Sequence, residues 1–268
     1  ANTTSPVSGY WGGVIINGKA PISGSKTDKS DTALTEINND YKYGGSAADD
    51  NSGSLTYVKI CYAGARSTAD IEHNGLTLNG VGNGTKIENI YVLESADDAI
   101  EFFGGTVNVT NLLAVNPDDD MFDFTQGYCG TLKNCYGVWE SDYTSTEADP
   151  RGIEADGNMD GLYPDHLRQS DFKVENMTIV NNAANTADNV DRMQDVIKIR
   201  RGAKATITNA LVKGTGGAID LVDMKDSKGA GNIESSINIT STLSLTGLKQ
   251  NGELNTFVES ADNTGADA

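Results

Sequence analysis

Acidic and basic side chains recur at matching places in a short repeated pattern of this sequence, where apolar residues alternate with them. The residues concerned are Glu101, Asp123, Glu154, Asp156, Lys198 and Arg200. If the repeats stack as strands, carboxylates on neighbouring copies lie about 5 Å apart, and each ionisation opposes the next. Neutralisation by Lys198 or Arg200, binding of a metal ion, or retention of a proton by one carboxylate would each relieve this repulsion.

Two kinds of polysaccharide cleavage would use such a patch. A glycoside hydrolase would use two of the three carboxylates Glu101, Asp123 and Glu154. Adjacent repeats give about the 5 Å separation of a retaining pair, and alternate repeats about 10 Å, nearer that of an inverting pair. A lyase would use Lys198, Arg200 or Arg201 to remove a proton next to a uronate carboxylate that Ca²⁺ holds. The remaining interpretation is a solvated ladder of charges without catalysis.

The turns that precede two of these positions are rich in aspartate, namely Asp97, Asp98, Asp118, Asp119 and Asp120. Carboxylate oxygens at this density favour Ca²⁺, which takes six to eight oxygen ligands in loose geometry. The alternative is ordinary turn chemistry, because aspartate suits turns whether or not a metal binds. We expect a calcium site here and keep the alternative open.

The elements that must position these side chains follow from an internal repeat. A triplet of apolar, any and apolar residues, often entered from glycine, appears at 14–16, 76–78, 100–102, 122–124, 153–155, 197–199 and 219–221. Several copies follow one another at 22 to 24 residues, which is the length of one rung of a parallel β-helix. This alignment also places Lys198 beside Asp220 on the last two rungs.

A second pattern supports stacking independently, because it carries an asparagine at one fixed place. Its members are Asn89, Asn111, Asn134, Asn176 and Asn209, with Tyr57 in the same place of an earlier copy. Side-chain amides stacked at strand spacing can each donate and accept a hydrogen bond along the column. A leucine-rich repeat or a β-sandwich would not produce these two patterns in phase.

We therefore predict an all-β fold, a single-domain right-handed parallel β-helix (solenoid) with long inserted loops. The β-helix domain spans 1–247, and a polar C-terminal tail spans 248–268. The predicted insertions lie at about 24–54, 138–151, 157–171 and 180–194. Within the first of them, the segment 30–36 is expected to form a helical turn.

Composition limits the partners. The formal charge of −18 disfavours nucleic acid and anionic lipid, and no apolar run is long enough to span a membrane. Cys61, Cys129 and Cys135 lack the spacing of a zinc site, while Cys129 and Cys135 could close a small disulfide loop or stay free. His73 and His166 stand in no catalytic spacing and are expected in loops or at the surface.

Four stretches resemble a known family: Trp11–Gly18, the run from Asn74 to Tyr128, and the segments "RGIEADGN" and "IKIRRGAKATITNALV". They are similar to secreted bacterial β-helix proteins, largely uncharacterised, of the broad pectate-lyase-like architecture. The resemblance implies the fold and export from the cell. Because no basic region followed by an apolar stretch opens the sequence, we expect that an export signal has already been removed. It carries over no catalytic residue.

Two functions remain as expectations. The first is an extracellular or cell-surface module, stabilised by calcium, for adhesion, glycan contact or end-to-end self-assembly through unpaired rung edges. The second is a polysaccharide lyase or glycoside hydrolase that acts on an acidic glycan through the patch of Glu101, Asp123, Glu154, Lys198 and Arg200. The expected partner in either case is a polysaccharide or a cell-surface glycan.

Overall fold

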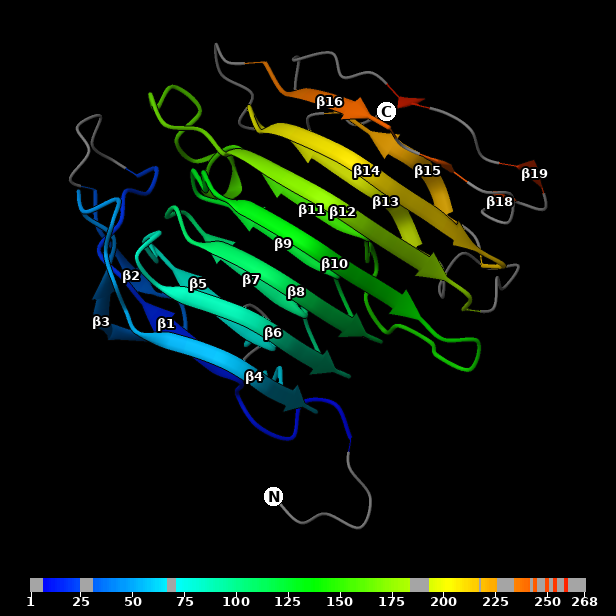
Figure 1. The fold of residues 1–268 in the computed structure, drawn as a ribbon, viewed down its shortest axis with the longest axis horizontal. Helices are drawn as coiled ribbons and strands as arrows, with labels where there is room; N and C mark the ends of the chain where they lie inside the picture. Colours follow the sequence, from blue (N-terminus) through cyan, green and yellow to red (C-terminus); the bar gives the residue numbers. More distant parts are fainter. Residues whose placement is uncertain are drawn as a thin grey trace.

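Two long parallel sheets, stacked face to face, form the body of the protein (Figure 1). The computed structural model describes residues 7–24, 31–66, 71–183, 193–216, 218–225, 234–241, 243–244, 249–250, 253–254 and 258–259. The chain alternates between the two sheets, and each returning strand lies beside the strand of the preceding rung. This arrangement is the predicted right-handed parallel β-helix.

The first sheet carries the predicted charged column on short strands. In spatial order its strands are β1 (Val14–Asn17), β5 (Leu76–Asn79), β7 (Ile100–Phe103), β9 (Phe122–Thr125), β11 (Ile153–Asp156), β13 (Met193–Arg200), β15 (Ala218–Asp223) and β20 (Val258–Glu259). The pairing Thr77↔Glu101↔Asp123↔Glu154↔Lys198 confirms that residues from five rungs lie next to one another.

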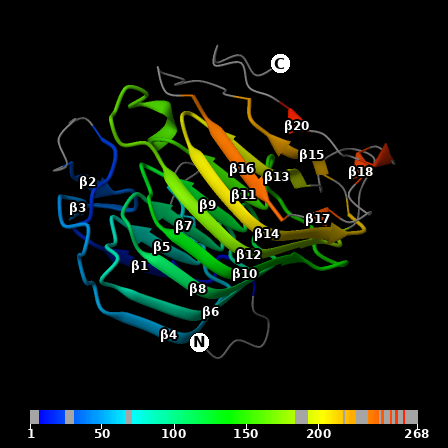
Figure 2. The same ribbon diagram turned by 45° about the horizontal axis from the view of Figure 1, so that its top comes forward.

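The second sheet consists of longer strands and carries the asparagine column. Its strands are β4 (Ser54–Cys61), β6 (Lys86–Leu93), β8 (Asn108–Val115), β10 (Thr131–Trp139), β12 (Asp171–Asn181), β14 (Lys204–Gly214), β16 (Ser236–Thr240) and β17 (Leu243–Ser244). Figure 2 shows this sheet in front of the first, with β4 at one end of the stack and β16 near the other. Outside the two sheets lie two hairpins and a short 3₁₀ turn: β2 (Ala33–Thr35) with β3 (Asn38–Tyr43), β18 (Lys249–Gln250) with β19 (Glu253–Leu254), and η1 (Met159–Gly161).

The core lies between the sheets because every second residue of a strand points inward. Phe102 and Phe124 stack with their ring centroids 5.0 Å apart, and Phe172 from the second sheet stacks on Phe124 at 4.1 Å. Tyr128 completes this aromatic group, and its hydroxyl donates to the carbonyl of Val107. The inward positions are thus filled, so chemistry is confined to the outer faces and loops.

The asparagine ladder, which we define as Asn89, Asn111, Asn134, Asn176 and Asn209, forms as predicted. The four amides after Asn89 each donate to the side-chain oxygen of the asparagine on the preceding rung, at N···O distances of 2.8 to 2.9 Å. All five residues have positive φ, between 54° and 58°, a conformation that asparagine tolerates better than most residues. Tyr57 has φ 57°, which confirms its place in the same column.

The alignment of the last two rungs was wrong. Lys198 pairs with Asp223, and Asp220 pairs with Asp195, because 25 residues rather than 22 separate the paired positions. This pairing places Val222 over Ile197, where both side chains are buried. Lys198 Nζ also lies 2.5 Å from Asp223 Oδ2. The longer rung therefore buries Val222 and gives Lys198 an acidic partner.

The expected helical turn at 30–36 was also wrong where the structure describes it. Residues 33–35 form strand β2, which pairs with β3 in an antiparallel hairpin. The hydroxyl of Thr35 donates to the carbonyl of Asn38, which closes the turn. The three cysteines are free, so Cys129 and Cys135 form no disulfide.

Candidate functional site

A cleft lies on the outer face of the first sheet, over β7, β9 and β11. Glu101, Asp123, Glu154, Asp156 and Arg200 line it, and Glu36 of the β2–β3 hairpin and Met159 of η1 lie at its edge. Five of the six predicted catalytic residues are therefore brought together. Lys198 is the exception, because its side chain is buried against Asp223 and does not line the cleft.

One half of this cleft is neutralised by arginines. Arg151 and Arg200 both form ion pairs with Glu154, and Asp156 accepts from Arg200 Nε at 2.7 Å and from Arg201 Nη1 at 2.6 Å. Burial by itself would raise the pKa of Glu154, but Arg200 and then Arg151 outweigh it and hold the pKa below its usual value. This carboxylate is therefore ionised.

Arg151 was missed in the sequence, although a signal for it existed. It stands two residues before the strand residue Ile153, as Asp98 and Asp120 stand before their strands. Its backbone N–H donates to Asp120 Oδ1 at 2.7 Å, and its Nε donates to Asp195 Oδ2 at 3.3 Å. The arginine thus interrupts a column of aspartates, which continues on the next rungs with Asp195 and Asp220.

The other half of the cleft is acidic. Asp98, Glu101 and Asp123 each offer a carboxylate oxygen, and these three oxygens lie within 4.8 Å of one another. Among the described residues, none of the three forms an ion pair with a basic side chain; Asn74 Nδ2 donates to Glu101 Oε2 at 2.5 Å. Burial, and then the neighbouring carboxylates, raise the pKa of all three well above the usual range. Asp123 Oδ1 is buried and has no hydrogen-bond partner in this part of the chain.

A second group of carboxylates adjoins the first and shares Asp98 with it. Asp97, Asp98 and Asp119 again bring three oxygens within 4.8 Å of one another. Burial raises the pKa of Asp97 to about 9, with further contributions from Glu72 and Asp119. Burial and then Glu154 raise the pKa of Asp119 to about 7, and its Oδ1 is buried without a partner in the described structure.

The other predicted metal ligands have structural partners. Asp120 accepts from the backbone of Arg151, and Asp98 accepts in the same way from the N–H of Asp120 at 2.9 Å. Asp118 accepts from the backbone N–H of Thr146 at 2.7 Å and from the Thr146 hydroxyl, so it anchors the loop after β10. Asp118 therefore lies apart from the two carboxylate groups, and turn chemistry accounts for it.

The comparison with known proteins decides the family. A family model described as a pectate-lyase-like β-helix domain matches residues 1–268. The chain belongs to the family of pectate-lyase-like β-helix domains. No curated protein and no solved structure showed a significant match to it. In the part of this pectate-lyase-like domain that the structure describes, no helix is both long and apolar enough to cross a membrane.

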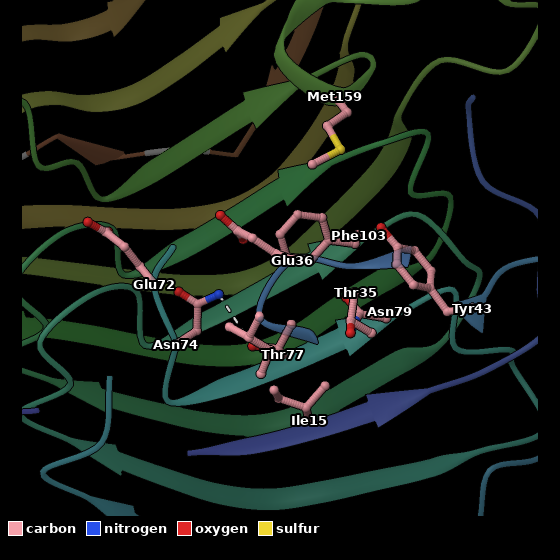
Figure 3. Close-up of a pocket in the computed structure, with 11 residues that line it drawn as sticks. Ile15, Thr35, Glu36, Tyr43, Glu72, Asn74, Thr77, Asn79, Phe103 and Met159 are labelled. Atoms are coloured by element: carbon pink, nitrogen blue, oxygen red, sulfur yellow. Dashed lines mark hydrogen bonds between the residues drawn. The ribbon is translucent and has the colours of Figure 1, made fainter. Parts of the chain in front are cut away.

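A smaller pocket of the pectate-lyase-like domain adjoins the acidic cleft on the side of β1 and β5. Glu36, Phe103 and Met159 line both spaces, so the two lie side by side. Figure 3 shows Phe103 and Tyr43 on one side of the pocket and Asn74 with Thr77 on another. The pocket is small: its accessible volume is about 20 Å³, room for about one group the size of a water molecule.

A buried histidine joins two loops of the pectate-lyase-like domain. His166 exposes 6% of its surface, and its Nε2 lies 2.5 Å from Asp31 Oδ2. The backbone N–H of Arg168 donates to His166 Nδ1 at 2.9 Å, which leaves Nε2 to donate to Asp31. His166 is in a loop, as expected, but it is not at the surface, and it ties the loop after β11 to the segment before β2.

Proposed function

We propose that this chain is an extracellular glycan-contacting module whose acidic cleft holds calcium. The observation that carries the proposal is the pair of buried carboxylate groups around Asp98, in which Asp123 Oδ1 and Asp119 Oδ1 have no partner among the described residues. Buried acceptors without partners are costly to a fold, so they indicate a missing cation or protons.

The residues fit calcium in their chemistry. Asp98, Glu101 and Asp123 would hold one ion, while Asp97 and Asp119 with Asp98 offer oxygens to another, and Ca²⁺ binds carboxylate oxygens in variable geometry. No nitrogen or sulfur ligand belongs to either group, which disfavours zinc. When bound, calcium would supply positive charge that attracts the carboxylates or hydroxyls of a sugar chain. The residues of this chain hold the ion and shape the cleft.

Contact with a glycan is supported by the family and by the walls of the cleft. Pectate-lyase-like domains take their description from a protein that acts on a polysaccharide, and the chain matches that family along its length. The β2–β3 hairpin and η1 rise beside an open sheet face, as the walls of an elongated groove do. The net charge of −18 suits a soluble protein outside the cell.

The test of calcium binding is a thermal melt with and without calcium. We expect calcium at about 100 times its dissociation constant to stabilise the fold by about 3 kcal/mol, and a chelator to remove that stabilisation. Asp123→Asn and Asp98→Asn should abolish most of the calcium effect. Glu175→Gln is the matched control, because Glu175 is an exposed carboxylate of the second sheet paired with Lys133. An unchanged melting temperature on addition of calcium would refute the proposal.

One observation favours a second candidate, a glycoside hydrolase. Asp123 and Glu154 pair on adjacent strands, and their pKa values move in opposite directions. A protonated Asp123 could serve as the acid and an ionised Glu154 as the nucleophile of a retaining reaction. The lyase alternative is less well supported, because Lys198 is buried in its pair with Asp223 and Arg200 is held protonated by Asp156 and Glu154.

A panel of acidic and neutral polysaccharides separates these activities. A reducing-sugar assay would detect hydrolysis, and the ultraviolet absorbance of unsaturated products would detect lyase action. Hydrolysis should disappear in both Asp123→Asn and Glu154→Gln, whereas the control Glu175→Gln should retain it. If neither assay detected activity on any polysaccharide of the panel, both catalytic candidates would be rejected and the binding module would remain as the proposal.

A further inference from the structure

The small pocket beside the acidic cleft combines apolar walls with acceptors. Tyr43 and Phe103 belong to a buried cluster with Ile22, and Met159 packs against it. Of these side chains, Tyr43, Phe103 and Met159 line the pocket (Figure 3). Hydrated metal ions gain little from aromatic and thioether surfaces, whereas the carbon skeleton of an organic ligand packs on them. The walls therefore favour an organic group.

The pocket also contains acceptor oxygens to which no hydrogen-bond donor of the described residues is directed. Asn74 exposes 3% of its surface, and its Nδ2 donates to Glu101 and Thr77, but its Oδ1 has no hydrogen-bond partner among the described residues. Glu36 and Glu72 add two carboxylates to the lining. A ligand that satisfies these oxygens must bring N–H or O–H donors, and positive charge would be favoured.

Of the two carboxylates that line the pocket, Glu36 is the one available to bind a ligand. Glu72 forms an ion pair with Arg66, with Nε and Oε1 3.4 Å apart. Glu36 has no ion pair in the described part of the chain, and it stands in the turn between β2 and β3. Burial, then Glu72 and Asp160, raise the pKa of Glu36 to about 7. A cation in the pocket would relieve this repulsion.

We propose that this pocket binds an organic ammonium group, the protonated amine of an amino sugar within a glycan chain. The ammonium enters the pocket between Glu36 and Asn74 Oδ1. The sugar ring stays outside the small pocket and packs on Phe103 and Met159, which also line the larger acidic cleft. Cation–π attraction from Tyr43 and Phe103 adds to the carboxylate contacts. The ammonium site stands by itself, while its place in a glycan rests on the proposed function, because the pocket shares Glu36, Phe103 and Met159 with the acidic cleft.

The test compares two oligosaccharides of equal length by calorimetry, a tetramer of glucosamine and its fully N-acetylated counterpart. The measurement uses the full chain at a pH where the free amine is protonated, both with calcium and with a chelator. We expect the glucosamine tetramer to bind at least about tenfold more tightly than the acetylated one. Glu36→Gln should weaken its binding about tenfold, and Glu36→Lys should abolish it.

Asp40→Asn is the matched control, since Asp40 lies in the same hairpin, is exposed and does not line the pocket. It should bind like the parent chain. Equal affinity for the two tetramers, no binding of either, or unchanged binding by Glu36→Lys would overturn the ammonium site. A third outcome separates the two proposals: the glucosamine tetramer still binds in chelator, and calcium does not change the melting temperature. That result would support the ammonium site and reject the calcium proposal.

Discussion

The two sheets of this β-helix each carry a polar column at the same rung spacing, and the columns differ in what they require. In the asparagine ladder of the second sheet, each amide donates to one neighbour and accepts from the next. In the acidic column of the first sheet, which we define as Asp98, Asp120, Glu101 and Asp123, the ionised groups can only accept. Stacked amides can hydrogen-bond to one another, whereas stacked carboxylates need a proton or a cation between them.

The difference shows why one column is structural and the other a candidate site. The asparagines are partly or fully exposed, so water could serve them even without the ladder. The carboxylates are largely buried, and their raised pKa values reflect the cost of ionisation there. Repetition therefore stabilises the asparagine ladder, whereas in the acidic column it gathers negative charge that a cation or protons must neutralise.

The largest effect is expected where the acidic column meets its arginines. Arg151→Met removes a buried cation that pairs with Glu154 and Asp195, and a buried pair that loses one partner costs about 3–5 kcal/mol. Chemical denaturation would measure the loss. The matched change on the second sheet is Lys133→Met, whose exposed pair with Glu175 contributes less than about 1 kcal/mol. Equal losses in the two variants would contradict the contrast between the columns.

The second prediction concerns pH in the presence of chelator. Asp97 has its pKa raised to about 9 and Asp119 to about 7, so the folded state retains protons that the unfolded state releases near pH 4. The free energy of unfolding is therefore greatest near pH 4 and falls as the pH rises towards 9, by up to about 3 kcal/mol between pH 5 and 7 for each retained proton.

Denaturation curves across this range would show the slope, and Asp97→Asn should reduce it. The control is Asn134→Asp in the other column, which adds an exposed carboxylate and should leave the slope near that of the parent chain. A stability that rises from pH 5 to 7 in chelator would contradict the predicted protonation.

A smaller loss is expected inside the asparagine ladder. Asn134→Ala removes one donated and one accepted amide bond and places alanine at φ 54°, which together should cost about 2 kcal/mol. Asn134→Gly keeps the backbone conformation available and should lose less. If alanine and glycine were equally destabilising in denaturation, the positive φ would contribute nothing.

The smallest effect is a gain at the end of the ladder. Tyr57 holds the ladder's backbone conformation, and its side chain is 83% exposed. Tyr57→Asn would place an amide beside Asn89 and should stabilise the fold by about 0.5–1 kcal/mol. A thermal melt would measure the gain, and Tyr57→Ser serves as a control that lacks the amide. A loss of stability would show that the ladder does not extend to this rung.

Much of this architecture could be predicted because its signals are local and repeated. The apolar triplets locate the strands, and the asparagines report both stacking and positive φ, as the bonds from Asn111 to Asn89 and from Asn134 to Asn111 confirm. The charged column followed from the same period. It placed Glu101, Asp123 and Glu154 on neighbouring rungs.

The remaining features depend on loop length or on distant contacts. Lys198 pairs with Asp223 because this rung is three residues longer than the rung from Glu101 to Asp123, and no local pattern reports that. His166 meets Asp31 across 135 residues, through two loops that carry no repeat. The hairpin that brings Glu36 to the cleft is likewise an insertion, so its position depends on tertiary packing.

The ladder amides all point the same way, since each one donates towards the N-terminal rung. Their dipoles therefore add along the axis instead of cancelling, and each bond polarises the next. A break at Asn134 divides the row into two short pieces, while a change at Asn209 merely shortens it. Tolerance to substitution should accordingly be graded along the solenoid, lowest at its middle and greatest at its two ends.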